Sequence, residues 1–95
     1  MTNFPQLRNY IASLRSGGKA RQFEISGYML AETPRKARSE AYRAAISEVH
    51  SFVPPLNVSL MQSNERAIEQ SKAYMLQAVD TLDLICSQNP ARRLH

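Results

Sequence analysis

Hydrophobic residues recur along much of the chain at the three- and four-residue spacing of an α-helix. The first such stripe predicts a short helix over residues 3–16, and it consists of Phe4, Leu7, Ile11 and Leu14. Asn3 is a suitable N-cap for this helix, and Gly17–Gly18 can end it in a left-handed turn. A helix this short is marginal in isolation, so it must pack against the rest of the chain.

Residues 21–31 follow a different pattern, in which apolar and polar residues alternate. The alternating residues are Phe23, Glu24, Ile25, Ser26, Tyr28 and Met29. A period of two is typical of a β-strand, and Gly27 interrupts it. Either this segment pairs with the same strand of a second copy, or it is an extended segment packed on helices. We favour the extended segment because the pattern offers no second strand in the chain.

Two longer helices are predicted in the rest of the chain. The first spans residues 34–53, since Thr33–Pro34 is a favourable helix start and Pro54–Pro55 is expected to stop the helix. The second spans residues 57–88 and forms an antiparallel hairpin with the first. Its apolar and small residues recur at alternating spacings of three and four, as in a heptad seam: Met61, Asn64, Ile68, Ser71, Met75, Ala78, Leu82 and Ile85.

This seam allows two interpretations, a coiled coil between copies or an ordinary core helix of one small bundle. Asn64 would set the register in a coiled coil, or would mark the end of the buried region. The stretch from Ala73 to Cys86 is apolar over most of its circumference, so it must be covered from more than one side. We therefore expect an all-α homodimer, with one helical domain per chain over residues 1–95. The residues of the dimer or core seam are Ile68, Met75, Val79, Leu82 and Ile85.

Composition narrows the class of protein. A chain of 95 residues and 10.7 kDa has room for one small domain. Its one cysteine, Cys86, rules out an intramolecular disulfide, and the apolar residues around it predict a buried thiol. The first residues lack the basic and apolar regions of a secretory signal, and no apolar run is long enough to span a membrane. We therefore expect a cytoplasmic protein without a membrane partner.

Catalytic and ligand-binding motifs are missing from the sequence. His50 and His95 lack a second ligand at metal-binding spacing, and the carboxylates are scattered. The segment from Ser16 to Lys19 resembles a phosphate loop, but Ser13 and Ala20 stand where that motif needs a glycine and a serine or threonine. We expect no enzymatic activity, no metal and no cofactor.

The positive charge is concentrated in the first half of the chain. The net charge is +4, yet residues 1–43 contain eight basic and three acidic side chains, and the remaining residues are slightly acidic. Cations in the first turn of a helix oppose its dipole, so the basic residues at the start of the second predicted helix invite a functional explanation. Otherwise they are solvated surface charge. The candidate partner-binding residues are Arg35, Lys36, Arg38 and Arg43.

One segment suggests a family. The stretch from Ile68–Ser71 through Gln77 to Leu84–Ile85 resembles the C-terminal helix of TraM-type antiactivators. Those proteins are small, all-helical and bacterial; they dimerise and block LuxR-type quorum-sensing transcription factors. The basic residues from Arg35 to Arg38 have no match in that family, so no functional residue is transferred. The resemblance implies an inhibitor that captures another protein.

Two functions follow from these observations. The first is a non-enzymatic, dimeric regulatory protein, of bacterial or phage type, that binds and inhibits a transcription regulator or a host protein. The alternative is a small nucleic-acid-binding protein that contacts backbone phosphates with the start of its second predicted helix.

Overall fold

The chain folds into α-helices along most of its length. The computed structural model describes residues 3–33 and 39–87, and these ranges contain no β-strand. The prediction of an all-α fold is therefore confirmed. The helices are α1 (Pro5–Ser13), α2 (Gln22–Glu32), α3 (Glu40–Ser51), α4 (Val53–Gln62) and α5 (Glu65–Ser87).

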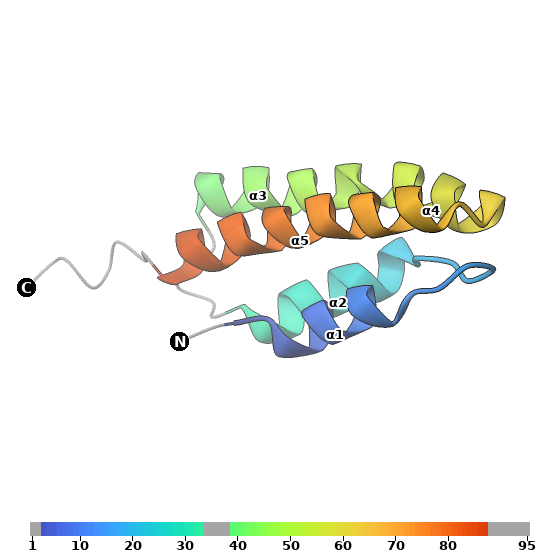
Figure 1. Ribbon diagram of the computed structural model, residues 1–95. Coiled ribbons are helices and arrows are strands. Elements are labelled where there is room, and N and C mark those ends of the chain that lie inside the picture. Colours follow the sequence, from blue (N-terminus) through green and yellow to red (C-terminus); the bar gives the residue numbers. More distant parts are fainter. Residues whose placement is uncertain (1–2, 34–38, 88–95) are drawn as a thin grey trace, which may run out of the picture.

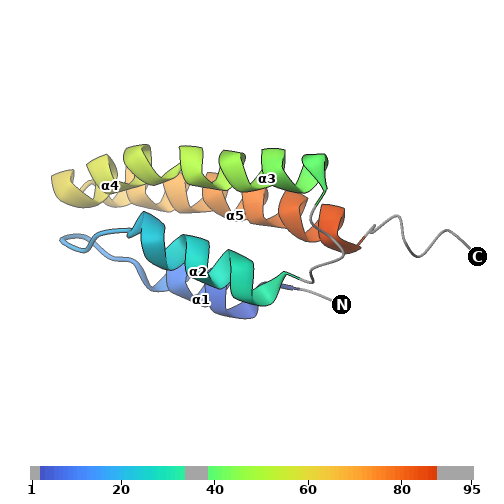
Figure 2. The ribbon, with the colours of Figure 1, turned by 180° about the vertical axis from the view of Figure 1, so that it is seen from behind.

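The five helices of the described residues form two packed groups. Helices α3 and α4 follow each other end to end, and the chain then reverses so that α5 runs back along both (Figure 1). Helices α1 and α2 lie beside each other against this long hairpin, as the opposite view also shows (Figure 2). Helix α5 contacts α1, α3 and α4. The predicted antiparallel hairpin with a C-terminal helix is therefore present.

The segment over residues 21–31 is helical, so the prediction that it is extended is wrong. Ile25, Met29 and Thr33 are buried at a spacing of four, which is the stripe of a helix that packs on one side. The alternating pattern depended on Phe23 sharing a face with Ile25. In the structure the Phe23 side chain is instead 89% exposed.

The helix boundaries around the proline pair also differ from the prediction. Helix α3 ends at Ser51, just before the proline pair as predicted. Pro54 and Pro55 also lie in the first turn of α4, where a missing N–H leaves no hydrogen bond unmade, so the hairpin's first arm continues past them. The chain reverses after Gln62, and the last helix begins at Glu65 rather than at residue 57. The predicted helix over residues 34–53 begins at Glu40 as far as it is described, and residues 34–38 lie outside the described residues.

Two residues produce the reversal between α4 and α5. Ser63 adopts a left-handed conformation with a φ of 54°, which ends α4. The side-chain oxygen of Asn64 then accepts a hydrogen bond from the backbone N–H of Ala67 at 3.2 Å. Asn64 is exposed and caps the start of α5. Of the two roles expected for Asn64, the end of the buried region is the one that fits, because the buried positions of α5 begin only at Ile68.

The seam of the C-terminal helix lies in the core of a single chain. Ile68, Met75, Val79 and Leu82 are at most 3% exposed, and Ile85 is partly buried against the same cluster. Helices α1, α3 and α4 cover them. A second copy is therefore not needed to cover this seam.

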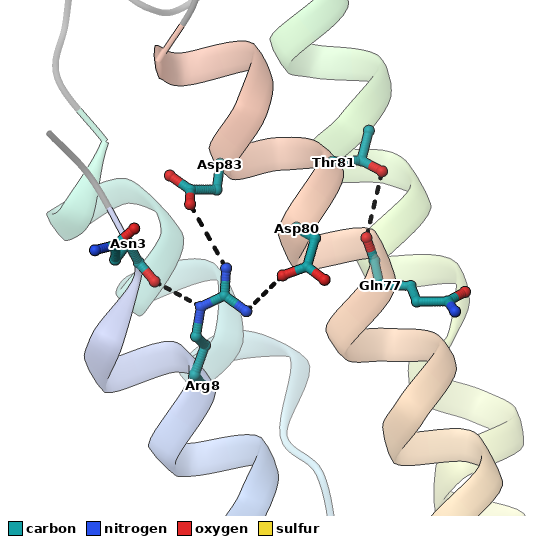
Figure 3. A network of polar contacts seen from close by, with 6 residues as sticks. All are labelled: Asn3, Arg8, Gln77, Asp80, Thr81 and Asp83. Atoms are coloured by element: carbon teal, nitrogen blue, oxygen red, sulfur yellow. Dashed lines mark hydrogen bonds and ion pairs between the residues drawn. The ribbon is translucent and has the colours of Figure 1, made fainter.

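Polar contacts fix α1 against α5. The Arg8 guanidinium forms ion pairs with Asp80 at 2.7 Å and with Asp83 at 3.6 Å, and its Nε donates to the backbone carbonyl of Asn3 (Figure 3). The carboxylate of Glu32, at the end of α2, accepts hydrogen bonds from two backbone N–H groups in the first turn of α1. These contacts set the position of α1 between α5 and α2.

The connection between α1 and α2 is fixed to α4. The Asn57 side chain accepts a hydrogen bond from the backbone N–H of Ala20 at 2.7 Å and donates one to its carbonyl at 3.0 Å. Gly17 has a φ of 85°, which favours glycine, and its N–H donates to the carbonyl of Leu60. The expected turn at the glycine pair is present, but it does not end the helix, because α1 already ends at Ser13 and its C-cap Leu14 is extended.

Truncation of the seam should destabilise the monomer. Leu82 is fully buried, so Leu82→Ala should lower the free energy of unfolding by about 2–5 kcal/mol through lost burial and a residual cavity. The matched control is Leu84→Ala on the same helix, where the side chain is 57% exposed and the expected loss is below about 0.5 kcal/mol. Urea unfolding followed by circular dichroism measures both. Equal losses in the two variants would contradict this description of the core.

Candidate functional site

Helix α2 leaves a stripe of apolar surface uncovered. Phe23 is 89% exposed and Leu30 is 53% exposed, and Gly27 lies between them. Spacings of four and three place all three residues on one face of the helix. We call Phe23, Gly27 and Leu30 the α2 face. Its large apolar side chains are of the kind that normally contribute to a core or an interface.

The α2 face exists because α2 is apolar on more than one side. Its buried residues, Ile25 and Met29, pack toward α1 and α3. Phe23 and Leu30 are offset from this buried stripe and so point away from the core. A helix that is apolar beyond its packed side has surface available for a further contact.

A pocket of about 320 Å³ lies next to the α2 face, between α2 and α3. Helix α2 contributes Ser26, Met29 and Leu30. Helix α3 contributes Tyr42, Arg43, Ile46, Ser47 and His50. We call this the α2–α3 pocket. Its volume is at the lower end of the range for small-molecule sites, and Leu30 belongs both to the pocket and to the α2 face.

Two buried polar atoms at this pocket have no hydrogen-bond partner within residues 3–33 and 39–87. The Nε2 atom of His50 lies 3.0 Å from the hydroxyl of Ser26, while its Nδ1 atom is buried and unpaired. The hydroxyl of Tyr42 is also buried and unpaired, and the Tyr42 side chain is almost fully covered. Most buried polar atoms in proteins have a partner, so this pair of atoms is unusual.

The electrostatics of the pocket combine a neutral histidine with a cation. Burial lowers the pKa of His50 below its ordinary value of 6.5, because desolvation disfavours the charged imidazole. Arg43 is exposed and forms no ion pair within residues 3–33 and 39–87. The pocket can therefore attract a negative group at its Arg43 side and apolar groups elsewhere.

The residues predicted to bind a partner are placed only in part. Arg43 is on α3 and lines the α2–α3 pocket. Arg35, Lys36 and Arg38 lie outside the described residues.

Sequence reasoning missed the α2 face. It assigned Phe23 and Ile25 to the same side of an extended segment. The seven-residue spacing from Phe23 to Leu30, offset from the stripe of Ile25 and Met29, is the signal that would have revealed a second apolar face.

Other kinds of site find less support in the described part of the chain. No group of three or more His, Cys, Asp and Glu residues is placed there to hold a metal ion. None of the described helices is both long and apolar enough to cross a membrane. The thiol of Cys86 is buried, as predicted, and its burial raises its pKa.

Comparison with known proteins gives no matching family model, no similar curated protein and no similar solved structure. The resemblance to TraM-type antiactivators therefore stays a prediction. The geometry of the α2 face and the α2–α3 pocket is the basis for assigning a function.

Protonation of His50 should couple stability to pH. Because the folded state lowers the pKa of His50, the unfolded chain binds the proton more tightly. The contribution of His50 to stability is therefore present above about pH 6.5 and is lost as the pH falls through the lowered pKa. We expect a lower urea midpoint at pH 5.5 than at pH 7.5, and a smaller difference in His50→Gln. An unchanged pH dependence in the variant would contradict the assignment.

Proposed function

We propose that the protein is a small, non-enzymatic regulatory module that acts by binding another protein through its α2 face. The observation that supports this most is the exposure of Phe23, at 89%, beside Leu30 on one face of a helix. Aromatic side chains are enriched at the centres of interfaces, where burial of one ring contributes a large share of the binding energy. An unpartnered aromatic on a rigid helix has the form of such an anchor.

The shape of the α2 face favours a helix as the partner element. Gly27 has no side chain, and a Cβ atom placed on it would have no neighbour within 4 Å. A partner backbone can therefore approach α2 closely at Gly27. The flanking side chains of Phe23 and Leu30 can then fit between side chains of an amphipathic partner helix. We propose that an apolar helix of the partner lies across α2 at Gly27.

The charge near the α2 face favours acidic residues on the partner. Arg21 at the start of α2 and Arg43 on α3 are exposed, and so are the carboxylates of Glu24 on α2 and Glu40 on α3. Along the sequence, Arg35, Lys36 and Arg38 follow α2 within a few residues. A partner helix with carboxylates beside its apolar face would match this balance and associate faster at low salt.

Binding of this kind inhibits by occupying a surface that the partner needs for its own contacts. A transcription regulator that dimerises through an amphipathic helix is a partner of the right chemistry, and it is the class that the TraM-type resemblance implies. The protein would then act as an antiactivator in the cytoplasm.

The homodimer expected from the sequence needs a surface other than the α5 seam, since the chain covers that seam itself. We propose that the α2 face provides it, so self-association and capture of a different protein compete for one surface. The relative affinities of the α2 face for a second copy and for the different protein determine which of them is bound and the mass of the complex in solution.

Nucleic-acid binding is the alternative function. It rests on the basic first half of the chain, but Arg8 is already engaged with Asp80 and Asp83. It also gives no role to the exposed apolar side chains of α2.

Site-specific crosslinking in the native host tests the proposal. A photoreactive phenylalanine analogue replaces Phe23 in one variant and Leu84, an exposed apolar residue of α5, in the control. We expect position 23 to crosslink to a different protein, identified by mass spectrometry, and position 84 not to yield that product. Crosslinks from position 23 to a second copy alone, or to nucleic acid alone, would contradict the proposal, as would equal yields at both positions.

Affinity for the crosslinked partner should depend on the aromatic ring. Phe23→Ala should weaken binding by about thirtyfold, as expected for an anchor residue worth about 2 kcal/mol. Leu84→Ala should change the affinity by less than about twofold. Calorimetric titration of the purified partner measures both. An unchanged affinity for Phe23→Ala would show that the α2 face is not the binding surface.

A substitution at Gly27 should change the stability of the protein and its affinity for the partner in opposite directions. Gly27 has no positive φ and open space around it, so Gly27→Ala should raise the free energy of unfolding by up to about 1 kcal/mol. The added methyl group should at the same time weaken the partner complex, because it separates the two helices. Urea unfolding and the same calorimetric titration measure the two effects. Tighter or equal partner binding by this variant would contradict close helix packing at Gly27.

A further inference from the structure

The α2–α3 pocket contains more unsatisfied polar groups than the fold requires. The hydroxyl of Tyr42 and the Nδ1 atom of His50 are both buried without a partner, and both residues line the same pocket. A buried hydroxyl without a partner has lost its water without gaining a hydrogen bond, which costs stability. Each such group in a folded protein calls for a specific explanation, and a bound ligand is one.

The rest of the lining indicates the chemistry of a ligand. Met29, Leu30 and Ile46 provide apolar walls, and Arg43 adds a positive charge that has no ion-pair partner in the described part of the chain. A guanidinium binds a carboxylate with two parallel hydrogen bonds, which is stronger and more specific than a contact with a neutral group. The pocket thus combines an apolar body with one anion-binding corner.

We propose that the α2–α3 pocket binds a small amphipathic carboxylate. Its carboxylate pairs with Arg43 and accepts a hydrogen bond from the Tyr42 hydroxyl, and its apolar body lies against Met29 and Ile46. A volume of about 320 Å³ suits a medium-chain or single-ring acid rather than a long lipid. This goes beyond the proposed protein binding. Because Leu30 and Arg43 belong to the surroundings of both surfaces, a bound acid and a partner helix would compete.

A titration of the ¹⁵N-labelled protein with octanoate tests the proposal directly. Amide spectra should show saturable shifts at Met29, Tyr42 and Ile46. Two matched probes have the same chain length: 1-octanol lacks the charge, and octylamine has the opposite charge. Octanoate should bind more tightly than either probe, because only a carboxylate can pair with Arg43.

Two variants resolve the contributions of the polar groups. Arg43→Gln should weaken octanoate binding by about tenfold and leave 1-octanol unaffected, since a charge-assisted contact is lost. Tyr42→Phe removes a hydroxyl that is unpaired in the free protein, so it should raise the urea midpoint and yet weaken octanoate binding. A purely structural role of Tyr42 would not produce these opposite effects. Phe23→Ala is the control, and it should leave octanoate binding within about twofold.

Several outcomes would overturn the proposal. These are the absence of saturable shifts, octylamine or 1-octanol binding as tightly as octanoate, an unchanged affinity in Arg43→Gln, or an equal loss in Phe23→Ala. The last result would mean that octanoate lies on the exposed α2 face instead of in the pocket. All probes are small molecules, so these results are independent of whether a protein partner is found.

Discussion

The structure depends on the burial of one side of α5. Met75, Val79 and Leu82 are completely buried, and they are covered by helices from both the beginning and the middle of the chain. Because α5 contacts α1, α3 and α4, its apolar stripe holds the long hairpin together and also anchors α1. The ion pairs from Arg8 to Asp80 and Asp83 add orientation to that packing, but the pair with the exposed Asp80 contributes little stability.

Helix α2 occupies a different position in this arrangement. It packs on α1 and α3, and Glu32 at its end ties it to the first turn of α1. Its apolar residues therefore divide into two sets: Ile25 and Met29 join the core, while Phe23 and Leu30 remain in solvent. The same junction leaves the α2–α3 pocket with its unpaired polar atoms. The α2 face and the α2–α3 pocket therefore both lie at the periphery of the hydrophobic core.

Much of the fold could be predicted from the sequence, and the errors have physical causes. The stripe from Ile68 to Leu82 repeats over many turns, so periodicity identified it as a helix and as a buried seam. Periodicity could not show what covers it, and the chain's own helices do so. In residues 21–31 the stretch is short, and a single exposed aromatic, Phe23, made a helix resemble a strand.

The proline pair and the binding surface show two further points at which prediction from the sequence fails. Pro54 and Pro55 are compatible both with the end of one helix and with the first turn of the next, and in the structure both occur, since α3 ends at Ser51 and α4 begins at Val53. Arg43 was identified through charge and does line a pocket. The exposure of Phe23 was not predicted, because an apolar residue is expected in the core. It becomes apparent only when it is known which side of α2 packs against the rest of the chain.

The most direct test of the account is to map the partner's footprint on the ¹⁵N-labelled protein by amide chemical-shift changes. We predict that the changes concentrate on α2 around Phe23, Gly27 and Leu30 and on the facing part of α3. Changes concentrated on α5 or on α4, with α2 unaffected, would contradict the central claim that the uncovered face of α2 is the binding surface.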